Sequence, residues 1–264
     1  MVLKANELLK AVLSISPWVD CNNTVDKIID GNPDKVLGKV LVVWRCSVET
    51  LNIAIREGYD GIIVHEPTYY FHENEAEELA ALPDDSPKKE TALLKQRMIR
   101  ENDLVIIRIH DTWDAREEVG IAATWAKSLG LANCVFRAEP MDCERRYDIN
   151  PTTAGALLET VKKAVSAYQL PLPVLYGDAN QAVSRVGIGA GCIADIETYI
   201  KMGCDVGICC DDGTSYWQDI SFAIDRKFPV IRVSHAAAEE AGIRIMANWI
   251  QDRFGIEAVY MQEV

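Results

Sequence analysis

Histidine and carboxylate side chains follow three buried, strand-like runs in this sequence. The run GIIV leads into His65 and Glu66, VIIRI leads into His110, and VIRVS leads into His235. Residues four apart share one face of a helix, so His235 and Glu239 can converge on one cation, and the H-x-x-x-D segment that starts at His110 has the same spacing. The candidate metal ligands are His65, Glu66, Asp114, His235 and Glu239.

These ligand types indicate divalent metal ions. Imidazole and carboxylate together suit Zn²⁺, Mn²⁺, Fe²⁺ or Co²⁺, and bridging carboxylates commonly hold two such ions roughly 3.5–4 Å apart. Taken alone, each cluster is typical of a solvated strand end, but three clusters at equivalent positions favour a site for two metal ions. Metals that lower the pKa of a water suggest hydrolysis, with His110 and Asp111 as the candidate catalytic residues that move the proton. His72 is the one histidine outside these clusters.

The elements that position these residues alternate along the chain. Short β-branched runs are followed by amphipathic segments, which predicts parallel strands joined by crossover helices and hence an α/β fold. Segment 39–71 aligns with segment 185–217, with Gly58 opposite Gly203 after a one-residue gap. We therefore expect two similar α/β halves, an internal pseudo-repeat with mainly parallel strands. Open parallel sheets bind ligands at the carboxyl ends of their strands, so the metal site is expected in the cleft between the halves.

The same patterns predict where the domains begin and end. We expect residues 1–137 plus 229–264 to form the first α/β domain, and residues 138–228 to form the second, repeat-related one. The charged segment 72–103 is helix-prone and interrupted by two prolines, which indicates a helical excursion from the first domain and a candidate lid.

Composition limits the possible partners. The net charge of −13 disfavours nucleic-acid partners, because it repels a phosphate backbone. No apolar stretch approaches the roughly 20 residues that span a bilayer, and the N-terminal segment reads as an amphipathic helix without a cleavage pattern, so we expect no membrane partner and a cytoplasmic protein. The eight cysteines form no C-x-x-C pair, which favours reduced, buried thiols. Metal binding by the adjacent Cys209 and Cys210 is the weaker alternative.

The glycine-rich segment GIGAGC could also be interpreted as a dinucleotide-binding loop. In GIGAGC, Gly187, Gly189 and Gly191 follow a strand, and two aspartates lie about 20 residues further on. Cys192 stands where the third glycine of G-x-G-x-x-G belongs, and the aligned loop of the first half has no glycine. The pattern therefore argues against a dinucleotide site.

The segments VHEPTYYF, HDTWD and SHAAAEEAG, in this order, resemble the signature blocks of the Nif-three family, the NGG-interacting-factor-like proteins also labelled GTP cyclohydrolase I type two. The family blocks read approximately HHP, HTxxD and GHxxSE. The resemblance implies a dinuclear metal centre on the five ligands named above, with His110 beside them, in two linked α/β domains that form a homohexamer. Glu66 replaces the second histidine of HHP, and Ser234 precedes His235 where the family usually has glycine. The first change should favour harder ions such as Mn²⁺ or Fe²⁺, or weaken one metal position.

Two functions remain open at this point. One is a metal-dependent hydrolase that acts on a small molecule, a nucleotide or another phosphoester as the family label suggests. The other is a non-catalytic regulatory or scaffold protein that binds metal and a partner protein. Tyr69 and Tyr70 follow the His-Glu pair and are candidates to line the substrate mouth, whereas packing between layers is the more common role of such aromatics.

Overall fold

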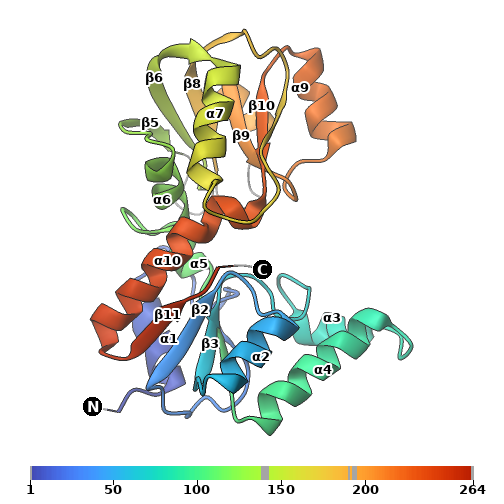
Figure 1. Cartoon of the computed structure of the whole chain (residues 1–264), viewed down its shortest axis with the longest axis vertical. Coiled ribbons are helices and arrows are strands. Elements are labelled where there is room, and N and C mark those ends of the chain that lie inside the picture. The colour runs from blue at the N-terminus through green and yellow to red at the C-terminus, as the bar shows by residue number, and fades with distance from the viewer. Residues whose placement is uncertain (1, 138–142, 190, 192–194, 263–264) are drawn as a thin grey trace. The chain divides into compact units, whose positions relative to one another are not determined.

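The chain forms two compact units, each with its own β-sheet (Figure 1). The computed structural model describes residues 2–137, 143–189, 191 and 195–262. One unit comprises Met1–Trp113 with Ile243–Glu263, and the other comprises Asp114–Gly242. These limits differ from the expected ones at 137 and 228, because residues on both sides of them, such as Trp125 and Ala237, pack in the core of the second unit. The expected α/β class is confirmed.

The sheet of the first unit is mainly parallel. Its strands are β1 (Ile28–Asp30), β2 (Lys39–Val43), β3 (Gly61–Val64), β4 (Val105–Arg108) and β11 (Glu257–Tyr260). They lie in the order β1-β4-β3-β2-β11, and β1 is the antiparallel member. The three central strands are buried nearly throughout and rich in valine and isoleucine, as expected for parallel strands covered on both faces.

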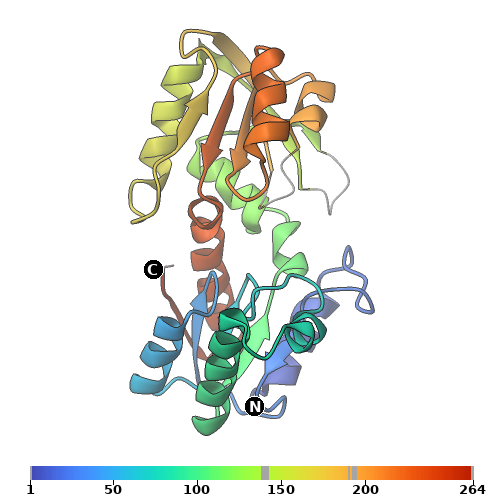
Figure 2. The ribbon, with the colours of Figure 1, turned by 90° about the vertical axis from the view of Figure 1, so that its right-hand side faces the viewer.

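Helices cover both faces of this sheet (Figures 1 and 2). α2 (Val48–Arg56) and α4 (Pro87–Glu101) pack on one face, where Leu51 and Ile99 join the strand side chains. α1 (Ala5–Ser14) and the C-terminal part of α10 (His235–Phe254) lie on the other. α4 begins with a serine cap followed by proline, and with α3 (Glu75–Ala81) it forms the predicted helical excursion. α5 (Asp111–Asp114) follows β4 directly.

The second unit has a mixed sheet in the order β5-β6-β8-β9-β10-β7. Its strands are β5 (Cys134–Arg137), β6 (Arg145–Thr153), β7 (Val174–Tyr176), β8 (Ala182–Ile188), β9 (Val206–Cys210) and β10 (Val230–Val233). β8, β9 and β10 are parallel, and the remaining strands pair antiparallel at the two edges. Its helices include α6 (Ile121–Ser128), α7 (Ala154–Val165), α8 (Ile196–Lys201), the π-helix η2 (Tyr216–Ile220) and α9 (Ser221–Asp225), and α10 begins in this unit.

The two aligned segments form β2-α2-β3 and β8-α8-β9, and they use matching residues in the same way. Gly58 and Gly203 follow the helices with φ of +70° and +75°, which is the left-handed conformation of a glycine cap. The carboxylate of Asp60 accepts hydrogen bonds from the backbone N–H groups of Gly38 and Lys39 at the start of β2. The carboxylate of Asp205 does the same at β8.

The glycines and cysteines of the second sheet have packing roles. A Cβ at Gly187 would lie 2.6 Å from the ring of Tyr199, and a Cβ at Gly207 would lie 3.0 Å from it, so the glycines make room for this buried ring. Cys209 and Cys210 are buried in β9, and burial raises the pKa of both thiols. No described helix has the length and apolar character needed to cross a membrane.

Candidate metal centre

The first group of predicted site residues lies at the carboxyl ends of β3 and β4. His65 is fully buried, and its ring nitrogen Nδ1 lies 3.0 Å from the carbonyl oxygen of Ile109. A carbonyl oxygen only accepts hydrogen bonds, so Nδ1 carries the proton and Nε2 carries the lone pair. Metal-binding histidines are typically held by such a second hydrogen bond. The hydrogen bond to Ile109 therefore leaves Nε2 as the nitrogen of His65 that has a lone pair to offer.

His110 lies against His65 and forms a pair with Asp111. The two imidazole rings stack with centroids 4.4 Å apart. Nδ1 of His110 is 3.0 Å from Oδ1 of Asp111, and Nε2 is 3.6 Å from Oε1 of Glu66. Burial raises the pKa of Asp111, but hydrogen bonds from His110 and Thr24 outweigh it and hold the pKa below its usual range. The charged carboxylate therefore fixes the proton of His110 on Nδ1.

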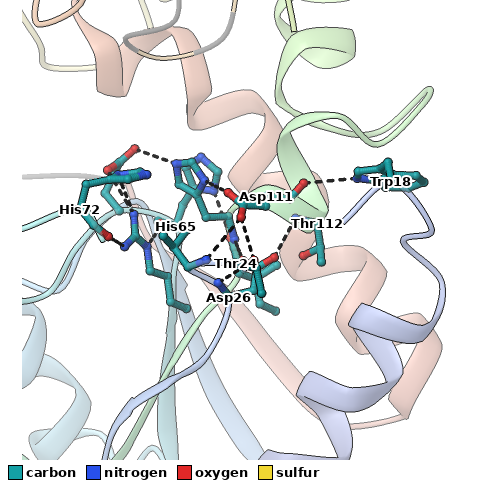
Figure 3. A network of polar contacts seen from close by, with 12 residues as sticks. Trp18, Thr24, Asp26, His65, His72, Asp111 and Thr112 are labelled. Atoms are coloured by element: carbon teal, nitrogen blue, oxygen red, sulfur yellow. Dashed lines mark hydrogen bonds and ion pairs between the residues drawn. The ribbon is translucent and has the colours of Figure 1, made fainter. Parts of the chain in front are cut away.

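Further hydrogen bonds fix the segment that carries this pair, as Figure 3 shows. The buried carboxylate of Asp26 accepts hydrogen bonds from the backbone N–H groups of His110 and Thr112, the latter at 2.8 Å. The hydroxyl of Thr24 donates to Asp111 at 2.7 Å. Burial raises the pKa of Asp26, and the two backbone hydrogen bonds oppose that rise. The start of α5 is thus held in place by acceptors on a distant segment.

Arg108 is fully buried at the end of β4 and binds both ends of segment 65–72. Its Nε donates to the carbonyl oxygen of His65 at 3.0 Å, and its Nη1 donates to the carbonyl oxygen of His72. Its Nη2 lies 3.0 Å from Nδ1 of His72. A guanidinium only donates, so this Nδ1 accepts and the proton of His72 lies on Nε2. Burial lowers the pKa of His72, as does the nearby charge of Arg108, so the ring is neutral.

His72 is the residue of this cluster that sequence reasoning missed. Its ring meets that of His110 edge-on, with centroids 4.8 Å apart. One possible ligand atom each from Glu66, His72 and His110 lie within 4.8 Å of one another. The proton on Nε2 makes His72 a hydrogen-bond donor in this arrangement. The one sequence signal was its position seven residues after His65.

The second group lies at the start of α10, beside the loop that follows β9. Nδ1 of His235 is 2.8 Å from Oδ2 of Asp212, and Nε2 is 2.9 Å from Oε1 of Glu239. Oδ1 of Asp211 accepts a hydrogen bond from the backbone N–H of His235 at 2.9 Å. Burial lowers the pKa of His235, but the charge of Glu239 and the hydrogen bond to Asp212 outweigh it and raise the pKa well above its usual value. The imidazolium therefore bridges two carboxylates.

A glycine lies against the His235–Glu239 pair. Gly191 has φ of +55°, and a Cβ there would lie 2.8 Å from Nε2 of His235 and 3.2 Å from Oε1 of Glu239. The two ligand atoms therefore face a position that only glycine leaves open. A divalent ion would replace the proton on Nε2, because metal ligands must be deprotonated. Residues 190 and 192–194 of the GIGAGC loop lie outside the described residues.

The remaining predicted site residues, Asp114, Tyr69 and Tyr70, differ in how far they are buried. Asp114 is buried at the end of α5. Tyr69 is 3% exposed, and its hydroxyl donates to Asp30 at 2.8 Å, so it packs in the core of the first unit. Tyr70 is 37% exposed and has φ of +74°, and Nζ of Lys95 lies 4.5 Å from its ring centroid. Of the two tyrosines, Tyr70 is the one with substantial exposed surface.

Fold and side chains together define a class: an α/β protein whose histidines and carboxylates gather at the carboxyl ends of parallel strands. The sequence matches the Duf34/NIF3 (NGG1p interacting factor 3) family over residues 8–263, and the chain belongs to that family. This confirms the resemblance of the three sequence blocks. No match to a curated protein sequence was found.

Several solved structures share the fold. Protein ybgI, described as of unknown function, has 20% sequence identity and a TM-score of 0.77, with 99% of each chain covered. Staphylococcus aureus protein SA1388 has 18% identity and a TM-score of 0.76, over 99% of this chain and 97% of that one. A Bacillus cereus protein related to NIF3 has 14% identity and a TM-score of 0.75, over 99% of this chain and 97% of that one. These identities support the fold and leave the function to be argued from the residues.

Proposed function

We propose that the chain binds two divalent metal ions and uses them to hydrolyse a nucleotide or another phosphoester. The proposed ligands are His65, Glu66, Asp114, His235 and Glu239. Zn²⁺, Mn²⁺, Fe²⁺ and Co²⁺ suit this set, and the carboxylate of Glu66 favours Mn²⁺ or Fe²⁺.

One observation carries the proposal. In each of the two histidine ligands, the Nδ1–H group donates a hydrogen bond to an acceptor. The acceptor is the carbonyl oxygen of Ile109 for His65 and the carboxylate of Asp212 for His235. Both rings are therefore held with Nε2 as the nitrogen that binds a metal. Metal-binding histidines depend on such a second hydrogen bond for their orientation and basicity.

The catalytic step is assigned to His110 and Asp111. Bound divalent ions supply Lewis acidity, which acidifies water and polarises a phosphoryl oxygen. His110 takes the proton of the attacking water on Nε2, the nitrogen opposite its hydrogen bond to Asp111. The carboxylate of Asp111 stabilises the imidazolium that results, and its hydrogen bonds to Thr24 and Val25 keep it in place.

Metal content tests the binding proposal. Elemental analysis of protein purified without chelator is expected to give about two equivalents of a transition metal. The double variant His235→Ala, Glu239→Ala should lose metal, because it removes both ligands from α10. Protein that is folded by circular dichroism and carries no metal would contradict the proposal.

Turnover tests the hydrolytic part. We expect metal-loaded protein to cleave bis(p-nitrophenyl) phosphate or a nucleotide from a panel of phosphoesters. His110→Gln should keep its metal and lose about 10²–10⁴-fold in kcat, because the general base is removed and the ligands are retained. Retained metal without turnover on any phosphoester would reject hydrolysis and leave metal binding as the function.

A further inference from the structure

A pocket of about 440 Å³ opens in the first unit beside the His110–Asp111 pair. Its walls come from segments that are far apart in the sequence: residues 22–25 with Lys27, residues 72–74, and Asp111. Nζ of Lys27 donates to the carbonyl oxygen of Glu73 at 3.0 Å and so joins the first two segments. The volume lies within the range of about 300–1,000 Å³ that is usual for small-molecule sites.

The chemistry of the walls restricts what the pocket binds. Among the side chains that line it, only that of Val25 is apolar, so the pocket does not suit a hydrophobic ligand. The carboxylates of Glu73 and Asp111 outnumber the ammonium of Lys27, so a phosphate or polyanion would meet repulsion. The lining side chains that remain are amides, a hydroxyl and an imidazole, which bind through hydrogen bonds. An uncharged, strongly hydrogen-bonding ligand fits this set.

Donors and acceptors in the pocket have fixed roles. Nδ1 of His72 accepts from Arg108, so His72 offers an Nε2–H donor whatever the ligand. The carboxylate of Asp111 is held by the hydroxyl of Thr24 and the backbone N–H of Val25, and it offers acceptor lone pairs. The amides of Asn22, Asn23 and Asn74 add groups that both donate and accept.

We infer that this pocket binds a sugar-like polyol, a group whose neighbouring hydroxyls each donate and accept a hydrogen bond. The pocket shares Asp111 with the proton-transfer pair, so the polyol would lie next to the reacting bond. The inference deepens the proposed function and rests on it in one respect: the polyol is taken to be part of the substrate. Binding of the polyol itself requires no metal, because no proposed ligand lines the pocket.

Saturation-transfer NMR on the full chain tests this inference, with D-ribose and D-glucose as the probes and with the protein treated with EDTA. We expect transfer to at least one sugar. The double variant Asn22→Ala, Asn74→Ala should weaken that binding about tenfold, since it removes two hydrogen-bonding groups from two different segments of the lining. Both asparagines are exposed, so the fold should be retained. Asn52→Ala, an exposed position on α2 outside the pocket, is the matched control and should bind like the wild type.

The outcomes separate this inference from the proposed function. Two results together would uphold the pocket and reject the metal proposal. The double variant would weaken sugar binding, and elemental analysis would find no metal in the protein even before treatment with EDTA. No transfer to either sugar, or equal transfer in the double variant, would overturn the inference. Displacement of the bound sugar by millimolar inorganic phosphate would also overturn it, because the pocket would then be an anion site.

Discussion

Replacement of Arg108 by methionine is expected to destabilise the first unit by about 3–5 kcal/mol, because it removes one partner from a buried ion pair. The guanidinium is fully buried and donates to the carbonyl oxygens of His65 and His72. The carboxylate of Glu75, 3% exposed, lies 3.7 Å from it. Burial already raises the pKa of Glu75, and Arg108 opposes that rise. In the variant the buried carboxyl must stay charged without this cation or take up a proton.

Urea unfolding followed by circular dichroism, with hydrogen exchange at the amides of β3 and β4, measures this loss. Arg100→Met is the control. Arg100 also pairs with a largely buried carboxylate, that of Asp30, but the arginine side chain is itself 64% exposed, so the loss of folding stability should stay below about 1 kcal/mol. Adding Glu75→Leu to the Arg108 variant should restore part of the stability, because an apolar pair can replace a buried ion pair. A loss below about 1 kcal/mol for Arg108→Met, or a further loss on adding Glu75→Leu, would refute the reasoning.

Three further predictions concern the second unit and the assembly. Gly191→Ala should abolish metal binding near His235. Gly130→Ala is the control, because Gly130 has a similar φ of +71° but no atom within 4 Å of its Cβ; this variant should keep the metal and lose only about 1 kcal/mol of folding stability. Equal metal content in the two variants would contradict the prediction. Asp195→Ala should cost about 1 kcal/mol at pH 7, since Asp195 caps α8. Burial raises the pKa of Asp195, but hydrogen bonds from α8 outweigh this effect and lower the pKa. The stability that the Asp195 cap provides is therefore fully present above the unfolded-state pKa and is lost as the pH falls through the folded-state pKa. A difference in urea midpoint between wild type and variant that does not change with pH would contradict this. Native mass spectrometry should detect a homohexamer of the 29.4 kDa chain, and monomer alone at micromolar concentration would reject that expectation.

The sequence predicted those features that depend on local pattern. Periodicity located the central strands, and the two prolines of segment 72–103 correctly predicted the break between α3 and α4. It also placed His65, His110 and His235 at strand ends, because strand runs and the polar residues after them are contiguous. These features need only a few neighbouring residues to be recognised.

The sequence did not predict the contacts that organise those residues. Asp26 holds the start of α5 from a segment 84 positions earlier in the chain. In the sequence, Arg108 is a single polar residue at the end of a strand, yet its guanidinium donates hydrogen bonds to both ends of segment 65–72. Such contacts depend on which side chains the completed fold brings together, and no periodicity encodes them. For the same reason, the adjacent Tyr69 and Tyr70 could not be assigned separately to core and surface.

The four histidines show why residue type and spacing are insufficient to assign roles. Each has its Nδ1 atom in a hydrogen bond, and the partner decides what Nε2 can do. A carbonyl oxygen or carboxylate holds the proton of His65, His110 and His235 on Nδ1, so that Nε2 can bind a metal or accept a proton. A guanidinium holds His72 in the opposite tautomer, which leaves a donor at Nε2. Exchange of that guanidinium for a carboxylate would therefore turn His72 from a donor into a possible ligand without any change in the histidine itself.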